Sequence, residues 1–246
     1  MSDSNQEHGP KVDTERRRFL KTLVFLGVAA AIGGAVPIVR YLIPPSAGLS
    51  GFPELLLVDS SGNPIKASSI PVNSPQTFLF NYPLQNEPNF LINLGDENNN
   101  PVPIPPTEVS VPADNSTYQF PGGVGPNKSI VAYSAICEHL GCTYPELHFY
   151  PPGYPPADTF NGPMTKVIHC SCHGSTYDPY KGGAVVTDPT RYPLPAVVLR
   201  WDPSTDRLYA TKMVGPTIYS HSDDLQGGSP PSTSEIVVRN AGNPFG

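Results

Sequence analysis

The sequence predicts an all-β protein of antiparallel strands, preceded by one N-terminal transmembrane helix. The 246 residues include 32 prolines and 22 glycines, which disfavour long helices and favour strands joined by turns. Short β-prone runs recur between residues 55 and 211, and two of them alternate or lead directly into a Cys/His motif. A long uncharged apolar run near the N-terminus predicts the helix.

The charge of the chain is sparse and negative in sum. Charged residues make up 15% of the chain, against a usual share of roughly a quarter, and the net charge is −6 with a pI near 5.4. The sequence has no basic patch, so nucleic-acid binding is excluded. Few cations also limit self-repulsion once carboxylates are protonated, which suggests an acidic exterior as a hypothesis; ordinary lineage bias is the alternative.

The N-terminal segment predicts a membrane anchor. Thr22 to Val39 are 18 residues without a charge, and such a helix reaches about 27 Å, close to the roughly 30 Å hydrocarbon core of a bilayer. The apolar run continues past Arg40, so the predicted span is 22–43. Three arginines and a lysine precede the span, whereas Arg40 is the one cation just after it. The positive-inside rule therefore places residues 1–21 in the cytoplasm and the body of a single-pass protein on the outer face of the cell membrane.

The residues just before the span, Glu15 to Lys21, resemble a twin-arginine export signal, although Glu15 stands where such signals usually have Ser or Thr. That route exports folded proteins, which suits a cofactor inserted in the cytoplasm. A stop-transfer anchor with basic flanks is the alternative, and it leaves the topology unchanged. Because the apolar run continues beyond Gly33 and Ala35, we expect an uncleaved anchor.

After the anchor, the sequence predicts a tether, a β domain and a tail. Residues 44–53 have the composition of a linker, the domain covers 54–219, and the tail at 220–246 is polar. Strands are predicted at Leu55 to Asp59, Thr77 to Tyr82, Phe90 to Leu94, Ser129 to Ile136 and Lys166 to His169, with a closing hairpin at Ala196 to Trp201 and Leu208 to Thr211. The Asn-rich and Pro-rich residues 95–127 are predicted to be loops.

All four cysteines fall in two short motifs. The motifs are Cys137-Glu138-His139-Leu140-Gly141-Cys142 and Cys170-Ser171-Cys172-His173-Gly174-Ser175, each directly after a predicted strand. A Cys-x-His followed by a Cys-x-x-His supplies two thiolates and two imidazoles, which suit a tetrahedral zinc site or a mixed-ligand 2Fe-2S cluster, and the spacing alone does not choose. Each motif has one further cysteine, and in an oxidising compartment two leftover thiols would pair as a disulfide between the loops.

With their additional cysteines, the two motifs resemble the cluster-binding loops of Rieske proteins of the cytochrome bc type. The resemblance implies one 2Fe-2S cluster and an antiparallel β fold whose cluster-binding subdomain, about residues 130–195, is inserted between strands. The implied ligands are Cys137 and Cys170 for the inner ferric iron and His139 and His173 for the outer iron, with a Cys142–Cys172 disulfide bridging the loops. Imidazoles in place of thiolates withdraw negative charge and raise the reduction potential.

Three further positions resemble residues that tune or shield the cluster. Ser175 and Tyr177 match hydroxyls that donate hydrogen bonds to cluster sulfurs in high-potential members; turn formation and packing are the plainer alternative. Leu140 resembles a residue that shields the cluster from solvent. Asp188 to Pro195 resembles, in its general role, a proline-rich loop that covers the cluster. The segment 143–169 is longer than bc-type members usually show, which leaves partner docking open.

A subdomain this rich in loops is expected to have little core, and therefore to depend on its cluster and disulfide. The remaining histidines are expected to be solvated or structural. They are His8, His148, His169 and His221.

The resemblance implies the Rieske subunit of a quinol-oxidising respiratory complex, either a quinol–cytochrome oxidoreductase or a quinol oxidase. His139 or His173 would take a proton from quinol while the cluster takes the electron. A membrane cytochrome b-type subunit and a haem electron acceptor are the expected partners. The alternatives are the Rieske subunit of an arsenite-oxidase-like exported oxidoreductase, a redox-inert zinc module and a soluble oxygenase ferredoxin. The anchor opposes the first, Ser175 and Tyr177 with the second cysteine pair oppose the zinc module, and the signal, anchor and disulfide oppose the ferredoxin.

Overall fold

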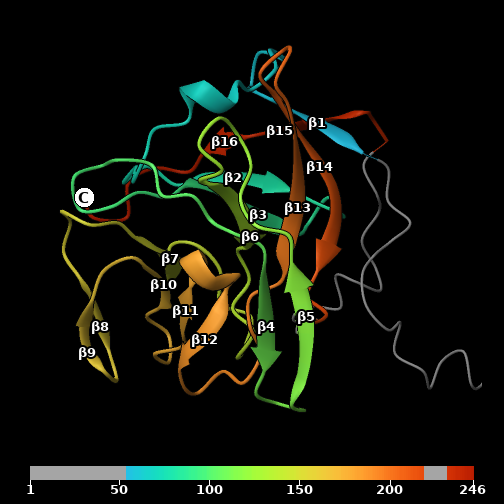
Figure 1. Cartoon of the computed structure of the whole chain (residues 1–246). Coiled ribbons are helices and arrows are strands. Elements are labelled where there is room, and N and C mark those ends of the chain that lie inside the picture. The colour runs from blue at the N-terminus through green and yellow to red at the C-terminus, as the bar shows by residue number, and fades with distance from the viewer. Residues whose placement is uncertain (1–53, 219–231) are drawn as a thin grey trace, which may run out of the picture. The chain divides into compact units, whose positions relative to one another are not determined.

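The computed structural model describes residues 54–218 and 232–246 (Figure 1). The predicted export signal, anchor, tether and first part of the tail lie outside these residues. Within the described ranges, no helix has the length and apolar character needed to cross a membrane. The helical elements there are two short 3-10 turns, η1 (Ala67–Ser69) and η2 (Pro179–Lys181). The predicted all-β class is therefore confirmed for the described domain.

The base of the domain is an eight-stranded sheet in the order β15-β1-β14-β13-β6-β3-β2-β16. Its strands are β1 (Leu55–Val58), β2 (Phe78–Asn81), β3 (Pro88–Asn93), β6 (Ile130–Ser134), β13 (Ala196–Asp202), β14 (Arg207–Val214), β15 (Glu235–Val237) and β16 (Arg239–Asn240). All neighbours are antiparallel except β1 and β15. β15 and β16 lie at opposite edges, although Val238 alone separates them in the chain. The two edges must therefore come close together, so the sheet curls into a nearly closed barrel.

A second antiparallel sheet, in the order β12-β11-β10-β7, is inserted into the base. Its strands are β7 (Leu147–Tyr150), β10 (Val167–Cys170), β11 (Thr176–Asp178) and β12 (Ala184–Thr187). The chain leaves the base after β6 and returns in β13, and these two strands pair with each other. We refer to residues 135–195 as the inserted unit; it carries both Cys/His loops.

Two hairpins complete the described domain. β4 (Thr107–Val111) pairs with β5 (Ser116–Phe120), and β8 (Ala157–Thr159) pairs with β9 (Gly162–Met164). The prediction that residues 95–127 form loops is wrong, because the first hairpin lies there. Val109 and Val111 alternate with polar residues and are buried, and Asn115 takes a φ of 59° in the turn. The surrounding prolines hid this alternation.

The other strand predictions are confirmed, with ends that agree within three residues. The predicted closing hairpin is β13–β14, which pairs from Ala196 with Val214 to Asp202 with Arg207. The polar tail was not predicted to contain strands, yet β15 and β16 pair with the base sheet. Two or three residues at a sheet edge are too few to show a hydrophobic period.

Two groups of buried side chains form the core. One belongs to the base and includes Leu57. The other joins Phe90 of the base with Leu147, Ile168 and Tyr177 of the inserted unit. The expectation that the inserted unit has little core is therefore wrong. Its short strands share a core with the base, so burial as well as cross-linking holds it.

The C-terminal residues pass from the base to the inserted unit. β16 pairs with β2, and shortly afterwards the ring of Phe245 lies 5.3 Å from His148, 5.5 Å from Tyr150 and 5.4 Å from Tyr154, measured between centroids. Aromatic rings at these distances attract each other. The C-terminus therefore ties the segment 143–169 to the base sheet.

Candidate metal centre

The first Cys/His loop follows β6 and closes on itself. The Cys137 N–H donates to the Cys142 carbonyl at 2.8 Å, and the Gly141 N–H donates to the Cys137 carbonyl at 2.9 Å. Gly141 has a φ of 76°, which glycine adopts without strain. Strand β6 thus delivers Cys137 to the start of a tight six-residue turn.

The second loop, between β10 and β11, repeats this geometry. The Cys170 N–H donates to the Ser175 carbonyl at 2.9 Å, and the Gly174 N–H donates to the Cys170 carbonyl at 2.9 Å. In both loops the first residue bonds to the sixth and the fifth, a glycine, bonds to the first. The two motifs are therefore equivalent as backbone structures, although their cysteine and histidine positions differ.

The four sulfurs divide into two pairs. Cys142 and Cys172 form a disulfide with their Cα atoms 6.8 Å apart, which is the pairing that the resemblance implies. Cys137 and Cys170 are buried thiols. The sulfurs of Cys142, Cys170 and Cys172 lie within 4.8 Å of one another, but a disulfide sulfur cannot become a thiolate, so only Cys170 of these three can bind a metal in this way. The available thiolates are thus Cys137 and Cys170.

Hydrogen bonds favour the thiolate form of Cys137. The hydrogen bond from the Cys170 thiol is the main cause that lowers the pKa of Cys137 to about 5, and burial opposes it. Smaller contributions in the lowering direction come from Tyr177, the His139 backbone and Ser175. The same thiol–thiol hydrogen bond, followed by burial, raises the pKa of Cys170. A thiolate is the form that binds iron or zinc.

The two motif histidines lie together. Their ring centroids are 5.0 Å apart and the ring planes are inclined by 80°. His139 is half-buried and His173 is exposed. The Nδ1 atom of His139 is buried and makes no hydrogen bond to the described residues. A buried ring nitrogen in this situation is suited to bind a metal.

The hydroxyls of Tyr177 and Ser175 lie beside the thiols. Tyr177 Oη accepts the Glu138 N–H at 3.0 Å and lies 3.3 Å from Cys137 Sγ. A Cys137 thiolate has no proton to give, so in that state the Tyr177 hydroxyl is the donor of this contact. Ser175 Oγ is fully buried and makes no hydrogen bond of normal distance and angle to the described residues. It is still close enough to Cys137 to contribute to the lowering of the Cys137 pKa.

This donor set fits a [2Fe-2S] cluster. Cys137 and Cys170 supply two thiolates, and His139 and His173 supply two imidazoles. At this site, two buried atoms that make no hydrogen bond to the described residues, His139 Nδ1 and Ser175 Oγ, would gain an iron and a cluster sulfur. A zinc ion could use the four ligands but would bring no sulfide acceptor for the serine hydroxyl.

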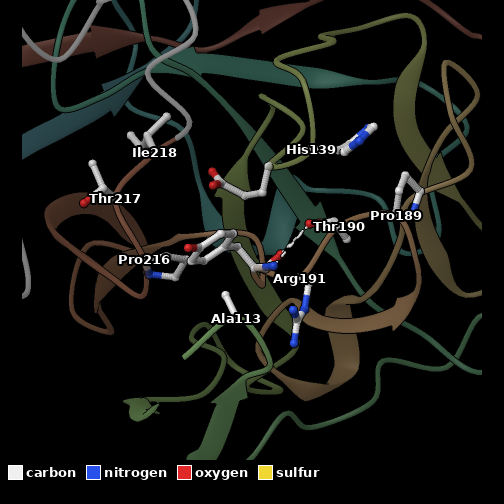
Figure 2. Close-up of a pocket in the computed structure, with 10 residues that line it drawn as sticks. Ala113, His139, Pro189, Thr190, Arg191, Pro216, Thr217 and Ile218 are labelled. Carbon is white, nitrogen blue, oxygen red and sulfur yellow. Dashed lines mark hydrogen bonds between the residues drawn. The ribbon is translucent and has the colours of Figure 1, made fainter. Parts of the chain in front are cut away.

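A pocket of about 560 Å³ opens beside His139. Figure 2 shows Pro189 and Thr190 of the proline-rich loop on the same side as His139, and Pro216, Thr217 and Ile218 opposite. Thr190 Oγ1 donates to the Tyr192 carbonyl at 3.0 Å. The Arg191 guanidinium donates to the Pro112 carbonyl at 2.9 Å. The loop that the resemblance implies as a cover thus lies beside His139 and is fixed to the β4–β5 hairpin.

Two residues that line this pocket were not predicted from the sequence. Glu138, between two motif ligands, is 5% exposed and lines the pocket. The pKa of Tyr118 is raised mainly by the burial of Tyr118 and further by the negative charge of Glu138. Ala113 reaches the pocket from the β4–β5 hairpin, which was predicted as a loop. A carboxylate inside a metal motif was the available signal for Glu138, whereas nothing local marks Ala113.

The shielding role of Leu140 stays a prediction, since its side chain is 44% exposed. His148 and His169 are structural, as predicted. Both are buried; His148 Nδ1 lies 2.7 Å from the Pro145 carbonyl and His169 Nδ1 lies 2.9 Å from Thr176 Oγ1. His8 and His221 lie outside the described residues.

Comparison with known proteins gives consistent matches. The family model of the Rieske [2Fe-2S] domain matches residues 105–198. The cytochrome b6-f complex iron-sulfur subunit of Trichodesmium erythraeum is 30% identical over 198 residues, covering 80% of this chain and 84% of the relative. The subunit of that name from Chlorobaculum tepidum is 26% identical over 191 residues, 77% and 72% of the two chains. The solved soluble domain of Rieske protein II from Sulfolobus acidocaldarius is 29% identical, covers 80% of this chain and 96% of that chain, and has a TM-score of 0.46.

The fold and the donor set define an iron–sulfur protein with two Cys/His loops on an inserted sheet. The matches place it further: the chain belongs to the Rieske [2Fe-2S] protein family, with bc-type relatives. Its cofactor is one [2Fe-2S] cluster.

Proposed function

We propose that this chain is the Rieske subunit of a membrane respiratory complex that oxidises quinol, and thus the electron-transfer subunit of a quinol–cytochrome oxidoreductase or quinol oxidase. This proposal rests on the exposed ring of His173. That ring lies 5.0 Å from the ring of His139, and its loop also contains the buried thiol of Cys170. An exposed imidazole can meet a hydroxyl-bearing donor, whereas buried thiols cannot. Similarity to relatives named as subunits of cytochrome b6-f complexes supports the assignment.

We assign Cys137, His139, Cys170 and His173 as the cluster ligands. When bound, the cluster accepts one electron at a potential that its two imidazole ligands raise above that of a four-thiolate cluster. Tyr177 donates to Cys137 Sγ, and such a bond stabilises the more negative reduced state. Ser175 acts in the same direction through its buried hydroxyl.

The histidines carry the proton. An exposed ring nitrogen of His173, or of His139, that has lost its own proton would accept a hydrogen bond from the quinol hydroxyl and take that proton as the electron leaves. Quinol oxidation releases two electrons and two protons, so one of each must leave through a partner. A membrane cytochrome b-type subunit suits that role, and a haem protein is the proposed acceptor of the electron carried by this chain.

The proposed topology follows the sequence. Residues 1–21 carry the export signal in the cytoplasm, 22–43 span the cell membrane, and 44–53 form a tether that lets the cluster domain move between quinol and haem. The domain at 54–219 lies on the outer face. Residues 220–246 form the tail, whose last strands join the base sheet.

A redox titration followed by EPR at several pH values, on the full chain in membranes, tests this function. We expect a rhombic signal of a histidine-ligated cluster, with a positive midpoint potential that falls as pH rises, because electron and proton uptake are coupled. A negative, pH-independent potential would contradict quinol oxidation and favour an arsenite-oxidase-like or ferredoxin role. A colourless protein that contains zinc would contradict the ligand assignment itself.

A further inference from the structure

The β8–β9 hairpin places an aromatic ring against the second Cys/His loop. Phe160 and Asn161 are the two turn residues between Thr159 and Gly162, which pair with each other. A methyl group at Gly174 would lie 2.5 Å from Cε2 of Phe160, so the ring lies in contact with this glycine. Gly174 directly follows His173. The segment between the two motifs thus reaches back to a proposed ligand.

Neither turn formation nor burial explains a phenylalanine at this position. Two-residue hairpin turns favour Asn, Asp and Gly, and Asn161 is the residue of that kind here. Phe160 is 71% exposed, although burial of such a ring would stabilise the protein. Most of that stabilisation is therefore not realised, and the ring instead lies in contact with Gly174.

The hairpin beneath the ring is fixed. Ala157 and Thr159 are buried. Thr159 Oγ1 donates to the Gly162 carbonyl at 2.7 Å, and the Asn161 N–H donates to Thr159 Oγ1 at 3.2 Å. In Figure 1 the hairpin lies at the end of the domain that carries β10 and β11. The turn is therefore fixed where Phe160 contacts Gly174 of the second loop.

Gly174 has a backbone conformation that the second loop requires of a glycine. Its φ of 93° lies where side chains are strained but glycine is not. Its N–H donates to Cys170, and its carbonyl accepts the hydroxyls of Thr176 at 3.1 Å and Thr187 at 2.8 Å. These bonds hold the peptide groups, and the Phe160 ring fills the space that a side chain would occupy.

We propose that Phe160 is a positioning residue for His173. By holding Gly174, the ring sets the orientation of the neighbouring imidazole and limits the approach of water from this side. This inference rests on the proposed role of His173 as a ligand. His139 lies in the other loop, beside the pocket that Pro189 lines. The effect of Phe160 is therefore confined to one of the two imidazoles.

The test is Phe160→Ala in the full chain with its cluster in place. Pulsed EPR of the reduced protein resolves the nitrogen couplings of two iron-bound imidazoles, and we expect one coupling to change while the other stays. The midpoint potential should rise, because water stabilises the more negative reduced state. Phe160→Leu, which keeps part of the apolar cover, should show a smaller rise in potential and a smaller change of the same coupling.

The matched control is Tyr154→Ala. Tyr154 is another exposed aromatic residue of the same segment, but its ring stacks on Phe245 with centroids 5.4 Å apart. It should leave couplings and potential unchanged. Equal changes in both alanine variants would overturn the proposal, because they would reflect general loosening of the segment.

Wild-type couplings and potential in Phe160→Ala would also overturn the proposal. If the alanine variant holds too little cluster to measure, the leucine variant must show a shift of the same sign, and its absence would count against the role. A wild-type spectrum with fewer than two imidazole couplings would instead refute the ligand assignment, which separates that failure from a failure of the role of Phe160.

Discussion

The base sheet and the inserted unit are held together by different means. The core of the base is built from apolar side chains on paired strands, such as Leu57 and Leu208, and its longest pair, β13–β14, extends from Ala196 to Val214. The inserted unit has strands of three or four residues and adds a disulfide and buried hydroxyls to its shared core. Loops that present metal ligands cannot also bury a continuous apolar face, so polar bonds and cross-links replace part of it.

A chain of hydroxyls under the second loop shows this difference. Thr176 Oγ1 lies 2.9 Å from His169 Nδ1 and accepts the Thr187 hydroxyl at 2.7 Å. The Thr176 hydroxyl donates to the Gly174 carbonyl, which also lies 2.8 Å from Thr187 Oγ1, so the one proton of Thr187 is shared between these two acceptors. All three side chains are buried, where unmet hydrogen bonds cost about 1 to 3 kcal/mol each. The loop is therefore fixed by groups that must all be satisfied together.

Removal of a proposed cluster ligand should produce the largest difference in stability between the inserted unit and the base sheet. We expect Cys170→Ser to abolish the cluster, measured as loss of bound iron and of visible absorption, because its thiolate is one of two that the site can supply. The base sheet should stay folded, measured by hydrogen exchange of β13 and β14, since these strands pack mainly in the core group that includes Leu57 and not in the group shared with the inserted unit. Exchange that accelerates equally in both regions would show that the base also depends on the cluster.

Removal of the disulfide should have the next largest effect. Cys142→Ser opens a link between positions 30 residues apart, and such links contribute about 3 to 4 kcal/mol in the chain-entropy description. We expect faster cluster loss on heating, with an unchanged EPR spectrum before heating because the four ligands remain. An unchanged cluster lifetime would show that the shared core suffices to hold the loops. Cys142→Ser with Cys172→Ser is the matched control for effects of the freed thiol.

The same difference decides what the sequence could predict. The hairpin of β13 and β14 was predictable because apolar residues and a turn signal follow each other locally. The donor set was predictable because Cys137 to Cys142 and Cys170 to Ser175 are themselves short motifs. By contrast, the roles of Glu138, Ala113 and Phe160 depend on contacts between distant segments. No local period reports such contacts, and prolines obscured the β4–β5 alternation.

Tyr177→Phe tests one hydrogen bond within the inserted unit. It removes the donor 3.3 Å from Cys137 Sγ, and a hydrogen bond to a charged group contributes about 1 to 2 kcal/mol, which corresponds to tens of millivolts for one electron. We expect the midpoint potential to fall by that amount with little change in unfolding of the base. Tyr118→Phe, whose partly buried side chain packs against the same core group as Tyr177, is the control. A potential equal to that of the wild type would remove Tyr177 from the tuning residues.

The smallest expected effect concerns a turn of the base, at Asp202. Its exposed carboxylate accepts the Ser204 N–H at 2.9 Å and the Ser204 and Thr205 hydroxyls at 2.7 Å each, and these bonds, led by the Ser204 side chain, lower the Asp202 pKa to about 2. A pKa below the unfolded value of about 4 stabilises the fold above pH 4, and the contribution disappears as pH falls from about 4 to about 2. Asp202→Asn should therefore have a lower free energy of unfolding than the wild type at pH 6. At pH 2 the free energies of the two proteins should lie closer together. The measurement is urea unfolding followed by Trp201 fluorescence. The free energy of unfolding of Ser204→Ala at pH 6 should lie between those of the wild type and Asp202→Asn. A difference between wild type and Asp202→Asn that does not change with pH would show that the turn stabilises the base through the backbone alone.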